Sequence, residues 1–132
     1  GSAMALPFPD DLFDCATVGW GLRNVPDMEV AIREMKRVVR PGGKVVSLDM
    51  GQPDLPLVRE LYWLCFEKLV PAVGKLLARD RSAYDYLHES ARAFPHPRVL
   101  AERFAAAGLV NARYYDLALG AVAVVEGTKP AL

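Results

Sequence analysis

The stretch that most constrains the fold is RVVRPGGKVVSLDM, residues 37–50. It predicts the last turn of a helix, then a stop, then a buried strand. Pro41 cannot continue a helix, and the two glycines after it tolerate the left-handed backbone angles of a helix exit. Lys44–Leu48 then gives a short β-branched run, which is typical of a strand. A helix that feeds a strand through such a turn is half of a β-α-β unit, so we expect a parallel sheet with helices on its faces.

Two earlier segments complete this unit. Phe13–Trp20, FDCATVGW, alternates two largely apolar sets of residues, as expected for a strand that is covered on both faces. The next helix is predicted over Met28–Val39, with Asp27 as its N-terminal cap and one apolar face. We therefore expect Phe13–Val18 and Lys44–Leu48 to be adjacent parallel strands joined by a crossover.

The second half of the chain is predicted to contain helices and then a pair of strands. Three helices are expected, at Leu57–Leu77 with a break near Pro71 and Gly74, at Ser82–Arg92, and at Arg98–Ala107. Two strands are expected to pair as an antiparallel hairpin, Leu109–Leu117 and Gly120–Glu126. The tail from Gly127 onward is expected to be turn or disordered.

Charge and composition exclude several classes of function. Basic and acidic residues number 16 each, so the net charge is zero and no nucleic-acid partner is indicated. Cys15 and Cys65 lie in apolar runs without the spacing of a metal site, and we interpret them as reduced core residues. The mainly apolar stretch 55–78 is interrupted by charges and proline, so it is not a membrane span. No signal peptide is visible, which favours a cytoplasmic protein.

Two groups of residues have alternative interpretations. Small residues in Gly19-Trp20-Gly21 let a ligand approach the backbone closely, or they merely relieve a turn. Tyr62, Trp63 and Phe66 share a wide apolar helix face, which is either ordinary core or the wall of a hydrophobic substrate pocket. The residue pattern alone leaves both alternatives open.

Several segments resemble a known family. LPFPDDLFDCATVGWGLRNVPD and AIREMKRVVRPGGKVVSLD are similar to the carboxyl-terminal part of class I S-adenosylmethionine methyltransferases. More narrowly, GLRNVPD, SAYDYLHESARAFP and the closing GAVAVVEGTKP resemble the C-methyltransferases of ubiquinone and menaquinone biosynthesis. The resemblance covers nearly the whole chain, from Leu6 to Pro130. It implies an α/β fold, the C-terminal half of a Rossmann-like methyltransferase fold, whose mixed sheet has parallel strands, an antiparallel C-terminal hairpin and helices on its faces.

The resemblance also implies an activity. The intact protein would use S-adenosylmethionine to methylate a ring carbon of a prenylated quinol, either demethylmenaquinone or a ubiquinone precursor. The family's glycine-rich cofactor loop and the acidic residue that holds the ribose do not appear in this sequence. We therefore expect residues 1–132 to be a single partial domain without the cofactor-binding half, inactive alone, with residues 1–2 a cloning remnant. The alternative is a non-catalytic half-domain that self-associates or pairs with a missing partner chain.

The resemblance assigns site residues. The catalytic residues would be Arg23, Tyr84 and His88; the cofactor-binding residues Ala3, Gly19 and Trp20; and the substrate-binding residues Asn24, Tyr62, Phe66, Tyr86 and Arg92. Arg23, a permanent cation, would stabilise a developing oxyanion, or it would instead form a salt bridge with Asp27. His88 would be the general base because histidine titrates near neutral pH, although a lone histidine on a helix is more often a surface or packing residue. The segment Leu48–Gly51 departs from the family pattern, and we assign no direct role to Asp49.

Partners follow from the substrate and from the sheet. A prenylated quinol is a lipid, so we expect peripheral contact with a membrane, although the sequence shows no membrane anchor. Phe13–Val18 would leave an apolar edge without a neighbouring strand, and such edges invite pairing. We therefore expect a homodimer through that edge, with a domain-swapped assembly or association through exposed helix faces as the alternatives.

Overall fold

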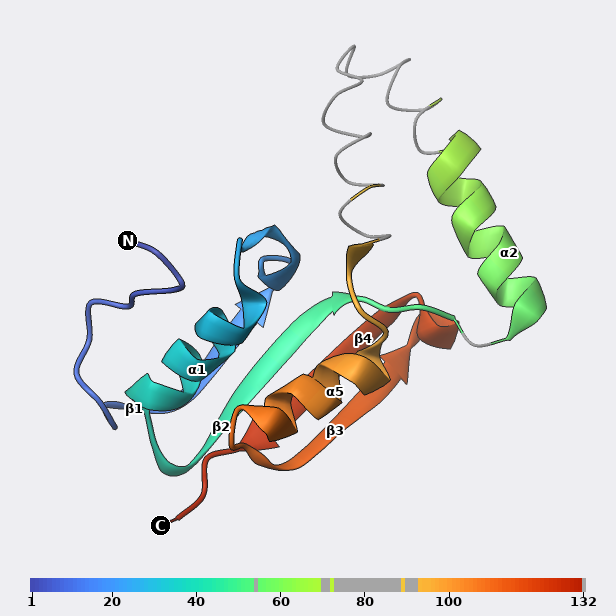
Figure 1. The fold of residues 1–132 in the computed structure, drawn as a ribbon. Coiled ribbons are helices and arrows are strands. Elements are labelled where there is room, and N and C mark those ends of the chain that lie inside the picture. The colour runs from blue at the N-terminus through green and yellow to red at the C-terminus, as the bar shows by residue number, and fades with distance from the viewer. Residues whose placement is uncertain (54, 70–71, 73–88, 90–92, 132) are drawn as a thin grey trace.

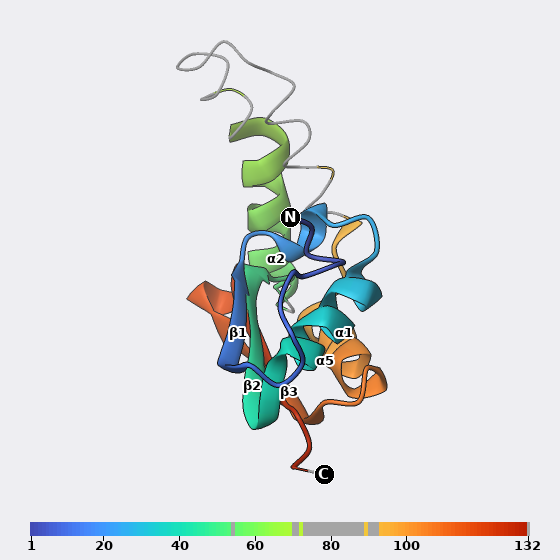
Figure 2. The same ribbon diagram turned by 90° about the vertical axis from the view of Figure 1, so that its left-hand side faces the viewer.

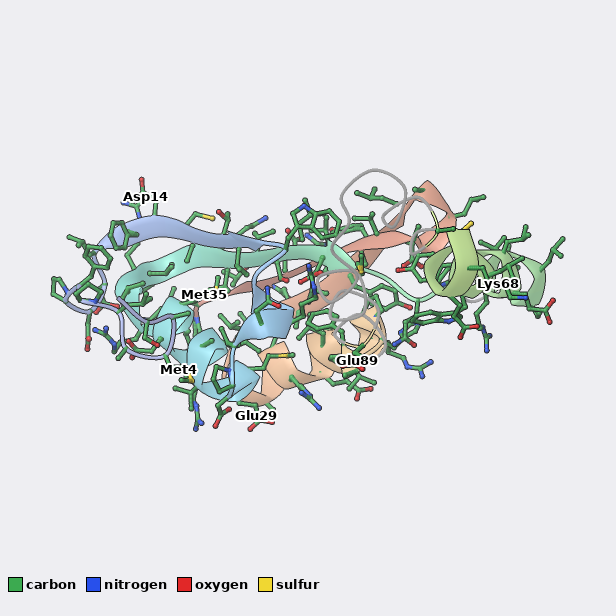
Figure 3. The ribbon with its side chains drawn as sticks, turned by 90° about the horizontal axis from the view of Figure 1, so that it is seen from above. Met4, Asp14, Glu29, Met35, Lys68 and Glu89 are labelled. Carbon is green, nitrogen blue, oxygen red and sulfur yellow. The ribbon has the colours of Figure 1, made fainter. Side chains whose placement is uncertain are left out.

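A computed structural model describes residues 1–53, 55–69, 72, 89 and 93–131. In this part of the chain a four-stranded sheet carries two helices, α1 and α5, on one face (Figures 1 and 2). Side chains between the helices and the sheet form the core. Figure 3 shows Met35 between α1 and the sheet, whereas Asp14 points away from the helices on the opposite face.

The sheet contains β1 (Phe13–Gly19), β2 (Val39–Met50), β3 (Val110–Leu117) and β4 (Val122–Thr128). Their order is β1-β2-β4-β3, so the last strand of the chain lies between the second and the third. β1 and β2 are parallel, with Ala16 opposite Val45, and β4 is antiparallel to both of its neighbours. The predicted parallel pair, the antiparallel hairpin and the mixed sheet are confirmed.

Helix α1 (Met28–Val38) begins as predicted. Its cap is Asp27, whose Oδ1 accepts the backbone N–H of Glu29 at 3.1 Å and of Val30 at 3.3 Å. One face of the helix is buried against the sheet, through Ala31, Ile32, Met35 and Val38. These apolar residues recur at helical spacing, which explains why this stretch folds as an amphipathic helix.

The role assigned to the Pro-Gly-Gly segment was wrong. α1 ends at Val38, and Val39 is already extended with φ −86° and ψ 139°, so no glycine ends the helix. Pro41–Gly43 instead lies inside β2, where Gly42 has φ +83° and the register against β1 shifts. Gly43 is packed so closely that an added Cβ would lie 2.5 Å from the carbonyl oxygen of Asp14. The segment is therefore an irregularity within the strand.

The expectation of an unstructured tail was wrong for the residues next to this segment. β4 continues to Thr128, and Lys129 exchanges two backbone hydrogen bonds with the glycines of β2. The N–H of Gly42 donates to the Lys129 carbonyl at 2.9 Å, and the N–H of Lys129 donates to the Gly43 carbonyl at 2.8 Å. Lys129 therefore continues the pairing of β4 with β2 as far as Gly42 and Gly43.

The helices of the second half agree in part with the prediction. α5 (Pro97–Ala106) has Pro97 at its start, His96 as its cap and Gly108, at φ +96°, after its end. α2 (Pro56–Leu64) continues into η2, a π-helical segment over Cys65–Leu69, and no residue of α2 is buried. Tyr62 and Trp63 on this helix are half-buried, so both interpretations of their apolar face, as core or as the wall of a substrate pocket, stay open. The predicted helix at Ser82–Arg92 lies, except for Glu89, outside the described residues.

Two expectations of burial were also wrong. Cys15 and Cys65 are free thiols, but both are exposed, so they are not core residues. In β1 the side chains of Asp14, Cys15 and Thr17 are exposed, so within the described residues this strand is covered on one face only.

The N-terminal segment is tied to α1 by one arginine. The guanidinium of Arg37 donates to the carbonyls of Leu6 and Phe8 and to the carboxylates of Asp10 and Glu34, at 2.7–3.1 Å. Glu34 also accepts the N–H of Leu6 at 2.8 Å. The hydrogen bond from Arg37, followed by that from Leu6, lowers the pKa of Glu34 to about 2. These bonds hold residues 6–10 against the flank of α1.

Candidate functional site

The carboxyl ends of β1 and β2 lie at the same edge of the sheet because the two strands are parallel. Open α/β sheets bind ligands at this edge. After β1 the N–H of Trp20 still donates to the carbonyl of Leu48 at 2.9 Å, and the chain then turns into η1, a 3-10 helix over Leu22–Asn24. Trp20 has φ +60° and its side chain is 44% exposed. A non-glycine residue in this strained conformation is often part of a functional site.

Arg23 and Asp49 form an ion pair at this edge. Nη1 of Arg23 donates to Oδ1 of Asp49 at 2.8 Å and to the carbonyl of Trp20 at 3.1 Å. The side chains are 12% and 2% exposed, so the pair is largely shielded from water. The alternative of a salt bridge between Arg23 and Asp27 is wrong, because the carboxylate of Asp27 caps α1.

Three polar atoms around this pair are buried without a hydrogen-bond partner among the described residues. They are Nε of Arg23, Oγ of Ser47 and Oδ2 of Asp49. Ser47 and Asp49 are two positions apart in β2 and therefore project from the same face of the sheet. An unpaired buried polar group costs about 1–3 kcal/mol, so such a group in a native fold calls for an explanation.

Tyr62 lies within electrostatic reach of the ion pair. Its hydroxyl donates to the carbonyl of Ala121 at 3.5 Å, and its ring meets that of Trp63 edge to face at 5.2 Å. Burial, and then the negative charge of Asp49, raise the pKa of Tyr62 to about 12, whereas the charge of Arg23 lowers it. Tyr62 is therefore a neutral hydrogen-bond donor at physiological pH.

Some predicted site residues share this edge and others do not. Gly19, Trp20, Arg23, Asn24 and Tyr62 belong to it, and the side-chain Nδ2 of Asn24 donates to the carbonyl of Trp20 at 3.3 Å. Ala3 instead lines a groove beside β1, and Phe66 lies in η2. Four residues lie outside the described part of the chain: Tyr84, Tyr86, His88 and Arg92.

The pairing of Asp49 with Arg23 was not predicted from the sequence, which gave Asp49 no direct role. The signal was present, because Asp49 is an isolated carboxylate at the end of a strand whose other inward residues are small or apolar. Its segment departs from the family pattern, and its burial becomes visible only once β2 is packed within the sheet. A carboxylate at the carboxyl end of a buried strand is a reasonable candidate for a site residue.

An apolar groove of about 410 Å³ runs along the free edge of β1. β1 pairs with β2 on one side and forms the edge of the described sheet on the other. The groove lies between this strand, the N-terminal segment and α1, and its lining includes Leu6, Phe8, Phe13, Val18, Val25 and Met35.

The described ranges contain neither a metal-binding cluster nor a membrane-spanning helix. No group of three or more histidine, cysteine or acidic side chains there could hold a metal ion. None of the helices in these ranges has the length and apolar character that crossing a bilayer requires.

Sequence comparison relates the chain to known enzymes. A sequence model of the ubiE/COQ5 methyltransferase family matches residues 1–129. The similar curated proteins include the demethylmenaquinone methyltransferases of Desulfitobacterium hafniense, 57% identical, and of Bacillus velezensis, 46% identical, each over 98% of this chain. The chain covers 51% and 55% of these two proteins, so it spans about half the length of the relatives it matches.

Solved structures give the same fold at lower identity. An S-adenosylmethionine-dependent methyltransferase from Thermotoga maritima has a TM-score of 0.69 and 20% identity, over 98% of this chain and 62% of that one. The structure of PigF with SAH has a TM-score of 0.59 and 20% identity, over 98% of this chain and 34% of that one. At such identities the likeness shows the Rossmann-like fold alone.

Proposed function

This chain belongs to the ubiE/COQ5 methyltransferase family, and on that premise we propose that the protein it represents methylates a ring carbon of demethylmenaquinone with S-adenosylmethionine. The proposal is carried by one observation, the shielded Arg23–Asp49 pair beside neutral Tyr62 at the carboxyl edge of β1 and β2. A ubiquinone precursor is the other quinol that the family's chemistry allows. Because either substrate carries a prenyl tail, we also propose peripheral contact with a membrane surface.

The residues at this edge suit alkylation of a quinol ring. A quinol carbon becomes nucleophilic as its hydroxyl loses a proton, and the oxygen then gains negative charge. Arg23 would stabilise that oxygen, because a guanidinium keeps its charge and works best where water is excluded. Asn24 would contact the ring, and Tyr62 and Phe66 would line the path of the prenyl tail. We keep His88 as the proposed base, with Tyr84, Tyr86 and Arg92 around the substrate.

We propose that the same edge also lines one flank of the cofactor. A Cβ added to Gly19 would have no atom within 4 Å, and the exposed indole of Trp20 lies next to this space. Gly19 and Trp20 would therefore line the cofactor, which when bound supplies the methyl group from its sulfonium. Asp49 is buried and paired with Arg23, so its carboxylate is not available to ribose hydroxyls. Ala3 would contribute only if the N-terminal segment reached the cofactor.

Methyl transfer can be tested with the full-length protein. The protein is incubated with methyl-labelled S-adenosylmethionine and a short-chain demethylmenaquinol, and the product is analysed by mass spectrometry. We expect the label on a ring carbon, and none on a menaquinol whose ring is already methylated. Label on oxygen, or no transfer to demethylmenaquinol by a folded protein that binds the cofactor, would contradict the proposal.

We expect the isolated chain to bind no S-adenosylmethionine that calorimetry can detect. The sequence lacks the family's glycine-rich cofactor loop and ribose-binding acidic residue, and at the described edge the carboxylate of Asp49 is paired with Arg23. The full-length protein is the positive control in the same titration. Micromolar binding by the isolated chain would overturn this prediction.

A second role, self-association of the isolated chain, is favoured by the free edge of β1 and the apolar groove beside it. We propose a homodimer through Phe13–Val18, because an unpaired apolar strand edge readily accepts another strand. Sedimentation equilibrium should give a dimer for the chain and a monomer for Cys15→Arg, which places a charge in the groove. Leu57→Arg, on the exposed face of α2, should remain dimeric. A monomeric unmodified chain would rule this role out.

A further inference from the structure

The Arg23–Asp49 pair is not built as a stabilising ion pair. A buried pair recovers the cost of removing its charges from water only when its remaining lone pairs and protons are also hydrogen-bonded. Here Nε of Arg23 and Oδ2 of Asp49 are both buried without a partner among the described residues. An apolar pair of similar volume would serve the stability of the fold as well or better. The reason for the pair is therefore to be sought in the site.

Asp49 is held more firmly than Arg23. It is the penultimate residue of β2, a strand that is paired on both sides, and its Oδ1 accepts the N–H of Met50 at 2.8 Å. Arg23 lies on the three-residue helix η1, between β1 and α1. The rigid element thus carries the carboxylate, and the short turn carries the guanidinium.

The hydrogen bonds restrain one corner of the guanidinium. Nη1 of Arg23 donates two hydrogen bonds, one to Oδ1 of Asp49 and one to the carbonyl of Trp20. The planar fork is oriented by these two bonds, while Nε has no acceptor among the described residues. A guanidinium held in this way is pre-organised to donate to an anionic oxygen without first rearranging.

We propose that Asp49 is a positioning residue: its carboxylate fixes the orientation of Arg23, so that the guanidinium meets the oxygen that becomes negative on the quinol ring. Asp49 acts through Arg23 and does not touch the substrate. This inference rests on the proposed function, and it assigns a role to the side chain that the family pattern left without one.

A double-mutant cycle in the full-length protein tests the inference. Asp49→Asn keeps the shape of the side chain and removes its charge, and we expect kcat to fall roughly 10- to 100-fold with the KM for S-adenosylmethionine little changed. In an Arg23→Ala background the same substitution should change kcat by less than about 2-fold, because coupled residues are not additive. Equal losses in both backgrounds, or a loss confined to KM, would overturn the inference.

Folding of each variant is checked by circular dichroism before its kinetics are measured. If Asp49→Asn does not fold, Asp49→Glu enters the same cycle, since it keeps the charge and displaces it by one methylene. A loss of kcat that disappears in the Arg23→Ala background again supports the inference, and an additive loss contradicts it. An inactive parent protein would overturn the proposed function and this inference with it, whereas an active parent with an unimpaired Asp49→Asn variant would overturn the inference alone.

Discussion

Arg23→Ala in the full-length protein should lower kcat for methyl transfer by roughly 10²- to 10³-fold, the usual cost of removing one donor that stabilises a developing oxyanion. The side chain is 12% exposed and is held by Asp49 and Trp20 in a shielded site, where a charge is worth more than it is in water. Initial rates at saturating S-adenosylmethionine and quinol measure the effect. The KM for the cofactor should change little.

Two controls separate chemistry from folding in this experiment. Removal of Arg23 leaves the carboxylate of Asp49 buried and unpaired, so rates are compared at a temperature at which circular dichroism shows the variant to be folded. Arg23→Lys keeps the charge but loses the planar fork, and it should retain an activity between those of the parent and the alanine variant. Full activity of Arg23→Ala would exclude the guanidinium from the reaction.

Phe104→Ala should lower the free energy of unfolding by about 3–5 kcal/mol, the range for truncation of a fully buried phenylalanine. Phe104 is 0% exposed and packs in the core between α5 and the sheet. Because natural domains are stable by only about 5–15 kcal/mol, the loss is a large part of the total. Urea denaturation followed by circular dichroism measures it.

The matched control is Leu119→Ala. Leu119 is 74% exposed, so its truncation removes little packing and should change the free energy of unfolding by less than about 0.5 kcal/mol. A loss below about 1 kcal/mol for Phe104→Ala would mean that the helices and the sheet do not share this core.

Local signals predicted most of the fold. Asp27 before an amphipathic run marked the start of α1, and two apolar runs separated by that helix implied the parallel pair β1 and β2. The predictions were wrong where residues distant in the sequence determine the local backbone structure. Lys129 pairs with Gly42 and Gly43, so neither the strand character of the tail nor the role of the Pro-Gly-Gly segment can be read from nearby residues.

The candidate site was predicted less completely. Arg23 and Tyr62 were named from the resemblance, but the partner of Arg23 lies 26 positions away and was missed. The two meet only because the carboxyl ends of β1 and β2 lie side by side, with Gly19 opposite Leu48. A nearby acidic residue, Asp27, was the obvious alternative in the sequence, yet helix capping uses its carboxylate.

The most direct test is to locate the binding site of the ring substrate on the protein. Hydrogen–deuterium exchange of the full-length protein is measured by mass spectrometry, with S-adenosylhomocysteine present, before and after addition of a short-chain demethylmenaquinone. We predict slower exchange in peptides that cover residues 18–26 and 47–53, and no change in residues 97–106 of α5. Protection elsewhere in the chain, with residues 18–26 unchanged, would contradict the placement of the site at the carboxyl edge of β1 and β2.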